Sequence, residues 1–195
     1  MQNKIQLTLA LLFISLGFFS PLQASEWHVD DTVTRQATFV SDAPFESFDG
    51  VTEKLDGYAQ WHGEDFTAQS EFYFEVDLNA IDTGIGLRNR HMQQNYLETD
   101  RFPLAQYEGR VVAVRPQEAG PRALELEGRF SVHGVTQDLR VTADVVWIEN
   151  RYHVHSRFNI RLNDYAIKIP AIMFYKINEL VEVRVDFYLK AAEEG

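Results

Sequence analysis

The stretch "FTAQSEFYFEVDLNA" (Phe66–Ala80) alternates apolar and polar side chains with a period of two. Successive side chains of a β-strand point to opposite faces of the sheet, so this pattern predicts a strand with one apolar and one wet face. The same alternation recurs in residues 124–132, 139–147, 152–160 and 181–189. Weaker candidates for strands are Thr32–Val40, Leu55–His62 and Arg110–Arg115.

Short segments rich in turn-forming residues separate these strands, among them "DAPFESFDG" (Asp42–Gly50) and "PQEAGP" (Pro116–Pro121). Strands with one apolar face and short connections are typical of an antiparallel sheet. Closing such a sheet removes its exposed edges. We therefore predict an all-β fold, a single antiparallel barrel of about eight strands. A barrel of this size is either filled by its own side chains or holds one small ligand, and the pattern leaves both open.

One segment, "TGIGLRNRHMQQNYL" (Thr83–Leu97), breaks the alternation. The spacing of Leu87, His91 and Gln94 favours one short helix. Phe102-Pro103 ends this helical segment, because the residue before a proline disfavours the helical conformation. The segment also holds the most concentrated positive charge of an acidic chain, which raises the question of what it binds.

The N-terminus has the order of a secretory signal peptide: Lys4, an uncharged apolar run from Ile5 to Phe19, and then "SPLQA" ending at Ala24. The run is short for a membrane span, although an uncleaved anchor is the alternative. We expect cleavage after Ala24, so that residues 1–24 are the signal peptide and residues 25–195 form one domain. We expect no stable membrane insertion of that domain.

Charge and composition narrow the function classes. The chain has 29 acidic and 18 basic residues, a net charge of −11, and no cysteine. Such a negative field repels nucleic acid, so we expect no nucleic-acid partner. The absence of cysteine excludes disulfides, thiol catalysis and thiolate metal sites. A cysteine-free exported chain fits a Gram-negative periplasm.

Neither catalysis nor metal binding has a clear motif. The sequence lacks Gly-x-Ser-x-Gly and His-Glu-x-x-His, so we expect no enzyme and no catalytic residue. His153 and His155 share one strand face, but a zinc site needs three or four ligands and the spacing offers no third. We interpret them as an exposed polar pair on the outer face, and we expect no metal site.

Three motifs, in order, resemble the YceI-like family of polyisoprenoid-binding proteins. The first combines a strand end, the polar segment and a turn, through Thr83-Gly84, Arg88, His91, Leu97 and Phe102-Pro103. The second is Gly134-Val135-Thr136 between two strands, and the third is a late loop with Asp164, Tyr165 and Ile167. Asn89 and Ala166 depart from the family's usual Asp and Gly.

The resemblance implies a lipocalin-like, eight-stranded antiparallel barrel that holds an isoprenoid lipid, such as an isoprenoid quinone or a polyprenyl phosphate. It implies no resident cofactor, unless the ligand is itself a quinone, and it places the polar segment as a short helical excursion at one barrel mouth. The alternative is a filled barrel that acts as a partner-binding or stress-associated module without a lipid.

The candidate site residues follow from the inward phase of the strands and from the family motifs. Arg88 and His91 are candidates for headgroup binding or, equally, for a structural role in closing the mouth, whereas Arg90 fits a solvated helix face. The apolar loop from Tyr165 to Tyr175 is either core or a gate. The expected cavity lining is Phe72, Phe74, Val76, Phe130, Val141, Phe158, Tyr165, Ile167 and Phe174.

Overall fold

The computed structural model describes residues 24–42, 47–115, 121–168, 171–172, 175–176 and 178–192. The predicted signal peptide up to residue 23, and Phe174, lie outside the described residues. The strands are β1 (Ala24–Val29), β2 (Gln36–Asp42), β3 (Ser47–Thr52), β4 (Leu55–His62), β5 (Glu71–Asp77), β6 (Leu104–Arg115), β7 (Arg122–Val132), β8 (Val135–Ile148), β9 (Arg151–Arg161), β10 (Ala171–Ile172), β11 (Tyr175–Lys176) and β12 (Leu180–Ala191).

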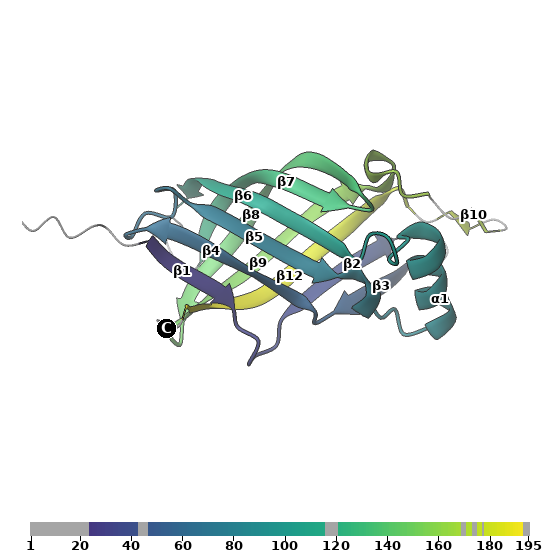
Figure 1. Ribbon diagram of the computed structural model, residues 1–195, viewed down its shortest axis with the longest axis horizontal. Helices are drawn as coiled ribbons and strands as arrows, with labels where there is room; N and C mark the ends of the chain where they lie inside the picture. Colours follow the sequence, from purple (N-terminus) through teal and green to yellow (C-terminus); the bar gives the residue numbers. More distant parts are fainter. Residues whose placement is uncertain are drawn as a thin grey trace, which may run out of the picture.

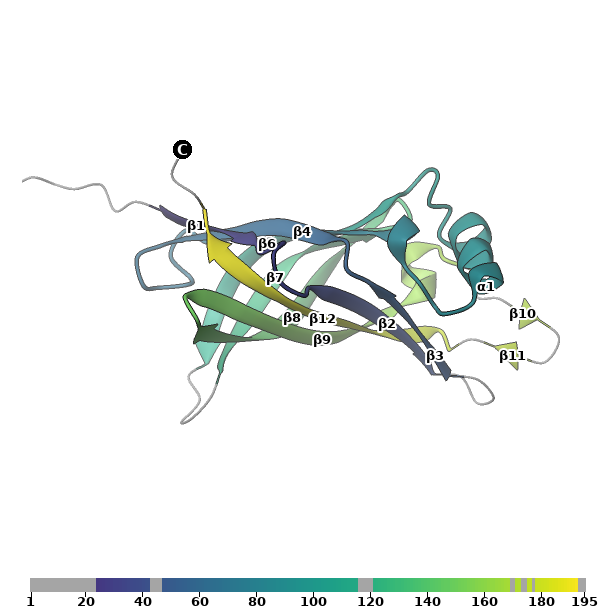
Figure 2. The ribbon, with the colours of Figure 1, turned by 90° about the horizontal axis from the view of Figure 1, so that it is seen from below.

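Eight of these strands close an antiparallel barrel in the order β1-β4-β5-β6-β7-β8-β9-β12, with β12 pairing back to β1. The long strand β12 changes partner along its length. Its last residues pair with β1, whereas Glu182–Asp186 pairs with β2, and β3 continues the sheet beyond β2. The β2–β3 hairpin therefore extends one wall of the barrel at one end (Figure 2). The predicted eight-stranded barrel is confirmed.

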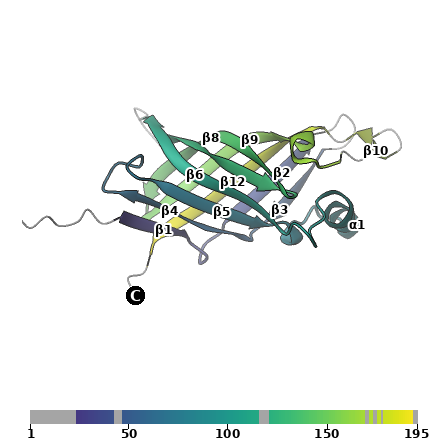
Figure 3. The same ribbon diagram turned by 45° about the horizontal axis from the view of Figure 1, so that its top comes forward.

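The helical segments gather at that same end, as predicted for the polar segment (Figure 1). They are a 3₁₀ turn η1 (Leu78–Ala80), the helix α1 (Gly86–His91), a π-helical turn η2 (Met92–Tyr96) that continues α1, and a second 3₁₀ turn η3 (Leu162–Tyr165). Figure 3 shows α1 and β10 as the outermost described elements there. We call this the helix end of the barrel.

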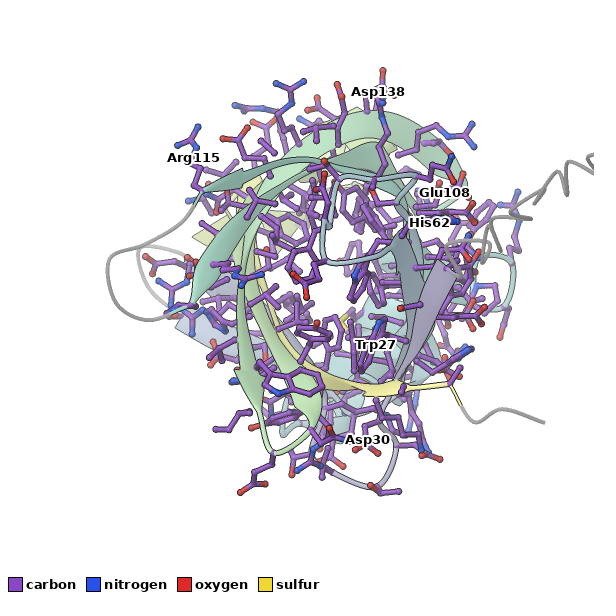
Figure 4. All side chains as sticks on the ribbon, turned by 90° about the vertical axis from the view of Figure 1, so that its left-hand side faces the viewer. Trp27, Asp30, His62, Glu108, Arg115 and Asp138 are labelled. Atoms are coloured by element: carbon purple, nitrogen blue, oxygen red, sulfur yellow. The ribbon has the colours of Figure 1, made fainter. Side chains whose placement is uncertain are left out.

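The opposite end is filled by aromatic side chains, and we call it the aromatic end. Trp27 of β1 stacks on Trp61 of β4 with ring centroids 5.7 Å apart, and Tyr152 of β9 packs against Trp27 at 4.8 Å. Trp147 and Phe66 complete the cluster, at 4.7 Å from Tyr152 and 4.9 Å from Trp61. Figure 4 looks onto this end and shows Trp27 on the inner side of the ring of strands. Edge and offset contacts of this kind stabilise beyond simple area burial.

The buried carboxylate of Asp30 anchors the backbone directly after the end of β1. Asp30 is only 3% exposed. It accepts hydrogen bonds from Thr32 Oγ1 at 2.7 Å and from Arg151 Nη1 at 3.1 Å, and Lys190 Nζ lies 3.6 Å away. Burial alone would raise its pKa, but the bonds from Thr32 and Arg151 and the charge of Lys190 outweigh it and lower the pKa to about 2.

The predicted inward faces are mostly confirmed: Leu124, Leu126, Phe130 and Val132 are buried along β7. The exception is Trp147, which the alternation places inward but which is 50% exposed. It lies near the end of β8, where the barrel wall stops, so one ring face packs on the aromatic cluster and the other meets solvent.

Two predictions of strand boundaries are wrong. The stretch Phe66–Ala80 is not one strand: β5 covers Glu71–Asp77, Phe66 lies in the preceding turn against Trp61, and residues 78–80 form η1. Strand β3 (Ser47–Thr52) begins inside the segment Asp42–Gly50, which the sequence predicts to be a turn. Its Asp49 and Gly50 have low strand propensity, but pairing with β2 overrides this. Gly50 is needed there, because a Cβ atom would lie 2.0 Å from the ring of Phe39.

Candidate functional site

A cavity of about 550 Å³ opens at the helix end and reaches into the middle of the barrel. Small-molecule sites in proteins typically measure about 300–1,000 Å³. Its inner wall is almost entirely apolar and comes from β5, β7, β8, β9 and β12, whereas its mouth is formed by the β2–β3 hairpin, α1 and η2. The helix end of the barrel is therefore hollow, unlike the aromatic end.

The cavity wall is built on aromatic contacts. Phe74 and Phe187 lie with ring centroids 5.0 Å apart, and Phe130 and Phe158 lie 6.0 Å apart. All four side chains line the cavity. The rings that border the cavity are therefore also packed against one another, which restricts their side-chain conformations.

Most of the lining residues predicted from the sequence border the cavity, but they make up only a small part of its wall. Among the predicted residues, Phe72 and Tyr165 are buried behind the lining, against Tyr107 at 5.0 Å and Phe130 at 5.5 Å. Phe72 shares a face with Phe74 but lies nearer the aromatic end, beyond the void. Phe174 and much of the predicted gate lie outside the described residues. Phe74, Val76, Phe130, Val141, Phe158 and Ile167 border the cavity, together with Arg88 and His91 at its mouth.

Arg88 and its neighbours form a hydrogen-bonded network that shapes the mouth. The Arg88 guanidinium donates to Thr83 twice, from Nε to Oγ1 at 3.0 Å and from Nη2 to the backbone carbonyl at 2.8 Å. Asn89 Oδ1 accepts from the Thr83 hydroxyl at 2.6 Å, and Asn89 Nδ2 donates to Asp82 at 2.7 Å. Asn89 can both donate and accept, so the residue that departs from the family pattern links Thr83 to Asp82.

The same arginine ties α1 to the β2–β3 hairpin. Its guanidinium carbon lies 4.2 Å from the centroid of the Phe48 ring on β3, a cation–π contact. Arg88 therefore has a structural role at the mouth, one of the two roles that the sequence left open. His91 differs from it: this side chain is exposed at the rim, and among the described residues it has no hydrogen-bond or ion-pair partner.

A second set of contacts, centred on His133, connects the elements on the other side of the mouth. His133 Nδ1 donates to the carbonyl oxygen of Tyr165 at 3.1 Å, and its ring packs edge-on against Phe102 at 5.2 Å. Its Nε2 lies 3.6 Å from Glu98, a residue that also pairs with Arg101. This histidine therefore joins the β7–β8 turn to the segment after η2 and to η3.

The sequence predicts a strand over most of β2, within Thr32–Val40, but sequence reasoning missed β3 and the polar groups that the two strands bring to the cavity. Ser41 and Thr52 border the cavity and are buried, and the Ser41 hydroxyl has no hydrogen-bond partner among the residues that the structure describes. Ser41 pairs with Phe48, the residue beneath Arg88. Ser41 and Thr52 flank the segment Asp42–Gly50, which reads as a turn, so the sequence offered no signal for these two polar groups.

The outer histidine pair lies where the strand phase predicts. His153 Nε2 and His155 Nδ1 both approach the carboxylate of Asp186, at 2.9 and 3.4 Å, and His153 stacks on Tyr188. Within the described ranges, no group of three or more His, Cys, Asp or Glu side chains could hold a metal ion. In the same ranges, no helix has the length and apolar content needed to span a membrane.

Comparisons with known proteins agree with this architecture. The family model described as the YceI-like domain matches residues 27–189. No curated protein matches the chain. The crystal structure of BcnA from Burkholderia cenocepacia is similar with a TM-score of 0.66 at 16% identity, over 85% of this chain and 99% of that one.

Two further solved structures share the fold. A polyisoprenoid binding domain from Saccharophagus degradans, described as implicated in plant cell wall breakdown, gives a TM-score of 0.64 at 18% identity, over 88% of this chain and 99% of that one. A YceI protein from Campylobacter jejuni gives 0.52 at 11% identity, over 98% and 94%. Because the family model covers most of the barrel, from β1 to β12, this chain belongs to the YceI-like family.

Proposed function

We propose that this protein is a periplasmic binding protein that holds one isoprenoid lipid, an isoprenoid quinone or a polyprenyl phosphate, in its barrel, and that it is not an enzyme. The observation that carries the proposal is the apolar cavity of about 550 Å³ that opens at the helix end. The structural likeness to a protein described as a polyisoprenoid binding domain supports it. A hollow barrel also favours a ligand over the filled-barrel alternative.

The apolar lining would supply most of the binding free energy. Each buried CH₂ group contributes about 0.8 kcal/mol before ordering costs, so one five-carbon isoprene unit contributes several kcal/mol. This contribution is non-directional and scales with the area removed from water. A chain of a few units would therefore bind without any strong polar contact.

The headgroup would lie at the mouth, beside Arg88 and His91. A charge-assisted hydrogen bond contributes about 1.5–3 kcal/mol, enough to discriminate a phosphate from an alcohol. Because Arg88 also holds Thr83, its replacement changes the mouth and the headgroup contact together. His91 has no such structural bond among the described residues, so it tests the headgroup role more directly.

Calorimetry in dilute detergent would test the proposal with a polyprenyl phosphate and the matching polyprenol. We expect Arg88→Ala with His91→Ala to weaken the phosphate at least about tenfold more than the polyprenol, from the magnitude of one charged hydrogen bond. Phe130→Ala with Phe158→Ala should weaken both ligands alike. Thr83→Val is the matched control, because it removes the hydroxyl that bonds both Arg88 and Asn89 but leaves both cations in the chain.

If Thr83→Val reproduces the pattern of the double variant, or if the double variant loses both ligands equally, the headgroup role is wrong. If the wild-type protein binds neither ligand, and native mass spectrometry of protein from its own periplasm shows no extractable lipid, the binding function itself is wrong.

The periplasmic location is tested separately by N-terminal sequencing. The sequence of the exported protein should begin at Ser25 or within a residue or two of it.

A further inference from the structure

The rim of the cavity exposes two large apolar side chains at the tip of the barrel. Ile85 is 51% and Leu87 is 58% exposed, although both also border the cavity. Ile85 caps α1 and Leu87 is its second residue, and α1 is among the outermost described elements at the helix end (Figures 1 and 3). Both side chains are therefore accessible to a surface that approaches the helix end from outside the barrel.

The charge of the segment that carries this rim, residues 83–97, is opposite to that of the chain as a whole. Residues 83–97 contain no Asp or Glu, but they contain Arg88, Arg90 and His91. Arg90 is exposed and has no ion pair or hydrogen bond with the described residues. Lys168, also exposed, borders the mouth from the segment after η3. Of the acids that flank this segment, Glu98 pairs with Arg101, whereas Asp82 accepts a hydrogen bond from the neutral Asn89 and keeps its charge, and Asp100 is exposed.

We propose that this rim, defined by Ile85, Leu87, Arg90 and His91, docks onto the surface of an anionic lipid bilayer. Apolar side chains beside exposed cations are the combination that holds a protein in the headgroup region, where the apolar groups enter the interface and the cations meet the lipid phosphates. The net charge of −11 repels such a surface from the other sides of the molecule. Docking is therefore oriented, with the cavity mouth toward the lipid.

The docking surface rests on the proposed function, and it provides a path by which the lipid could pass from the bilayer into the cavity. An isoprenoid lipid resides in a bilayer, and its transfer through water would expose the whole apolar chain. With the mouth seated on the bilayer, the lipid moves from one apolar environment to another. The aromatic end, which carries both described termini of the barrel, then points away from the membrane (Figure 1).

Flotation of the purified mature protein with vesicles would test the proposal, using phosphatidylethanolamine–phosphatidylglycerol vesicles and neutral phosphatidylcholine vesicles. We expect Leu87→Ser to weaken binding to the anionic vesicles about tenfold, the scale of one buried apolar side chain. Arg90→Glu should weaken it at least about fivefold, the scale of one cation at an anionic surface, and should have no effect with neutral vesicles.

Matched controls come from the aromatic end. Ile148→Ser removes an apolar side chain that is 45% exposed, and Arg115→Glu makes the same charge reversal as Arg90→Glu on an exposed arginine. Both should leave vesicle binding within about twofold. Equal losses in all four variants, or no binding of the wild-type protein to protein-free vesicles, would overturn the proposal.

Polyprenol binding in detergent separates this proposal from the proposed function, because no bilayer is present. A wild-type protein that binds polyprenol but not vesicles refutes the docking surface alone. A protein that binds vesicles through the rim but no polyprenol refutes the cavity's function and supports the docking surface.

Discussion

The two ends of the barrel use the same strands for different purposes. At the aromatic end, Trp27, Trp61 and Tyr152 pack against one another across the barrel, and a buried carboxylate joins β1 to β9 and β12. At the helix end, the inward positions surround a cavity, and a hydrogen-bonded network replaces apolar packing at the mouth. Aromatic packing is therefore concentrated at one end, and the other end retains the space in which a ligand could bind.

The largest contrast should appear when an aromatic side chain is truncated at each end. Trp61→Ala should lower the free energy of unfolding by about 3–5 kcal/mol, because Trp61 is buried and contacts three aromatic neighbours. Phe158→Ala should cost about 1–2 kcal/mol, because its ring already borders a void and loses fewer contacts. Urea denaturation followed by circular dichroism measures both. Equal losses would mean that the two ends are equally packed in solution.

Acid should weaken the aromatic end through Asp30. Its folded pKa of about 2 lies below the unfolded value of about 3.8, so it contributes about 2 kcal/mol above pH 4, and this contribution is lost as the pH falls from 4 to 2. Asp30→Asn should be less stable at pH 7, and the difference from wild type should shrink over that range. At the helix end Asp82 is exposed, so Asp82→Asn should change the pH profile less. Parallel pH profiles for wild type and Asp30→Asn would contradict this assignment.

The two ends can also be compared through the backbone conformation of the tight turns on either side of β8, the β7–β8 turn at the helix end and the β8–β9 turn at the aromatic end. At the helix end, Gly134 has a φ of +73°, and a Cβ atom would lie 2.5 Å from the Phe102 ring. Gly134→Ala should cost about 1–3 kcal/mol, from the left-handed backbone and the contact together. Thermal unfolding measures the loss. Gly134→Ala with Phe102→Leu is the control: it should recover part of the loss if the ring contact contributes.

The smallest effect should have the opposite sign. At the aromatic end the β8–β9 turn places Glu149 and Asn150 at φ of +48° and +65°. Two-residue hairpin turns with positive φ at both positions favour glycine at the second, so Asn150→Gly should raise the free energy of unfolding by a few tenths of a kcal/mol. A small rise in the midpoint of thermal unfolding would confirm it, whereas a fall would mean that the Asn150 side chain contributes a contact of its own.

Much of the fold could be predicted from the sequence, because a period of two reports which face of a strand is apolar. The long strands β7, β8, β9 and β12 follow it closely. The prediction fails where pairing, rather than pattern, makes the strand. Strand β3 contains Asp49 and Gly50 and forms because β2 lies beside it. Phe66 shows the converse, since it keeps the alternating phase but belongs to a turn.

The site was less predictable, because alternation identifies inward positions but not which of them border a void. Phe72 and Phe74 have the same chemistry and the same phase, yet Phe72 packs against Tyr107 and Phe74 lines the cavity. That difference depends on which residues of distant strands meet them. The role of Arg88 in holding Thr83 is also hidden in the sequence, where the two residues are five positions apart in a segment without regular periodicity.

All three tryptophans of the chain lie in the aromatic cluster, and none of them lines the cavity. Intrinsic fluorescence of this protein therefore reports one end only. Its emission should follow the loosening of the aromatic end on heating, while an aliphatic ligand that enters or leaves at the helix end should change it little. A quinone is different, since it can accept excitation energy across the barrel. Emission that dims with a quinone, but not with a polyprenol of equal length, would distinguish the two lipid classes without any label.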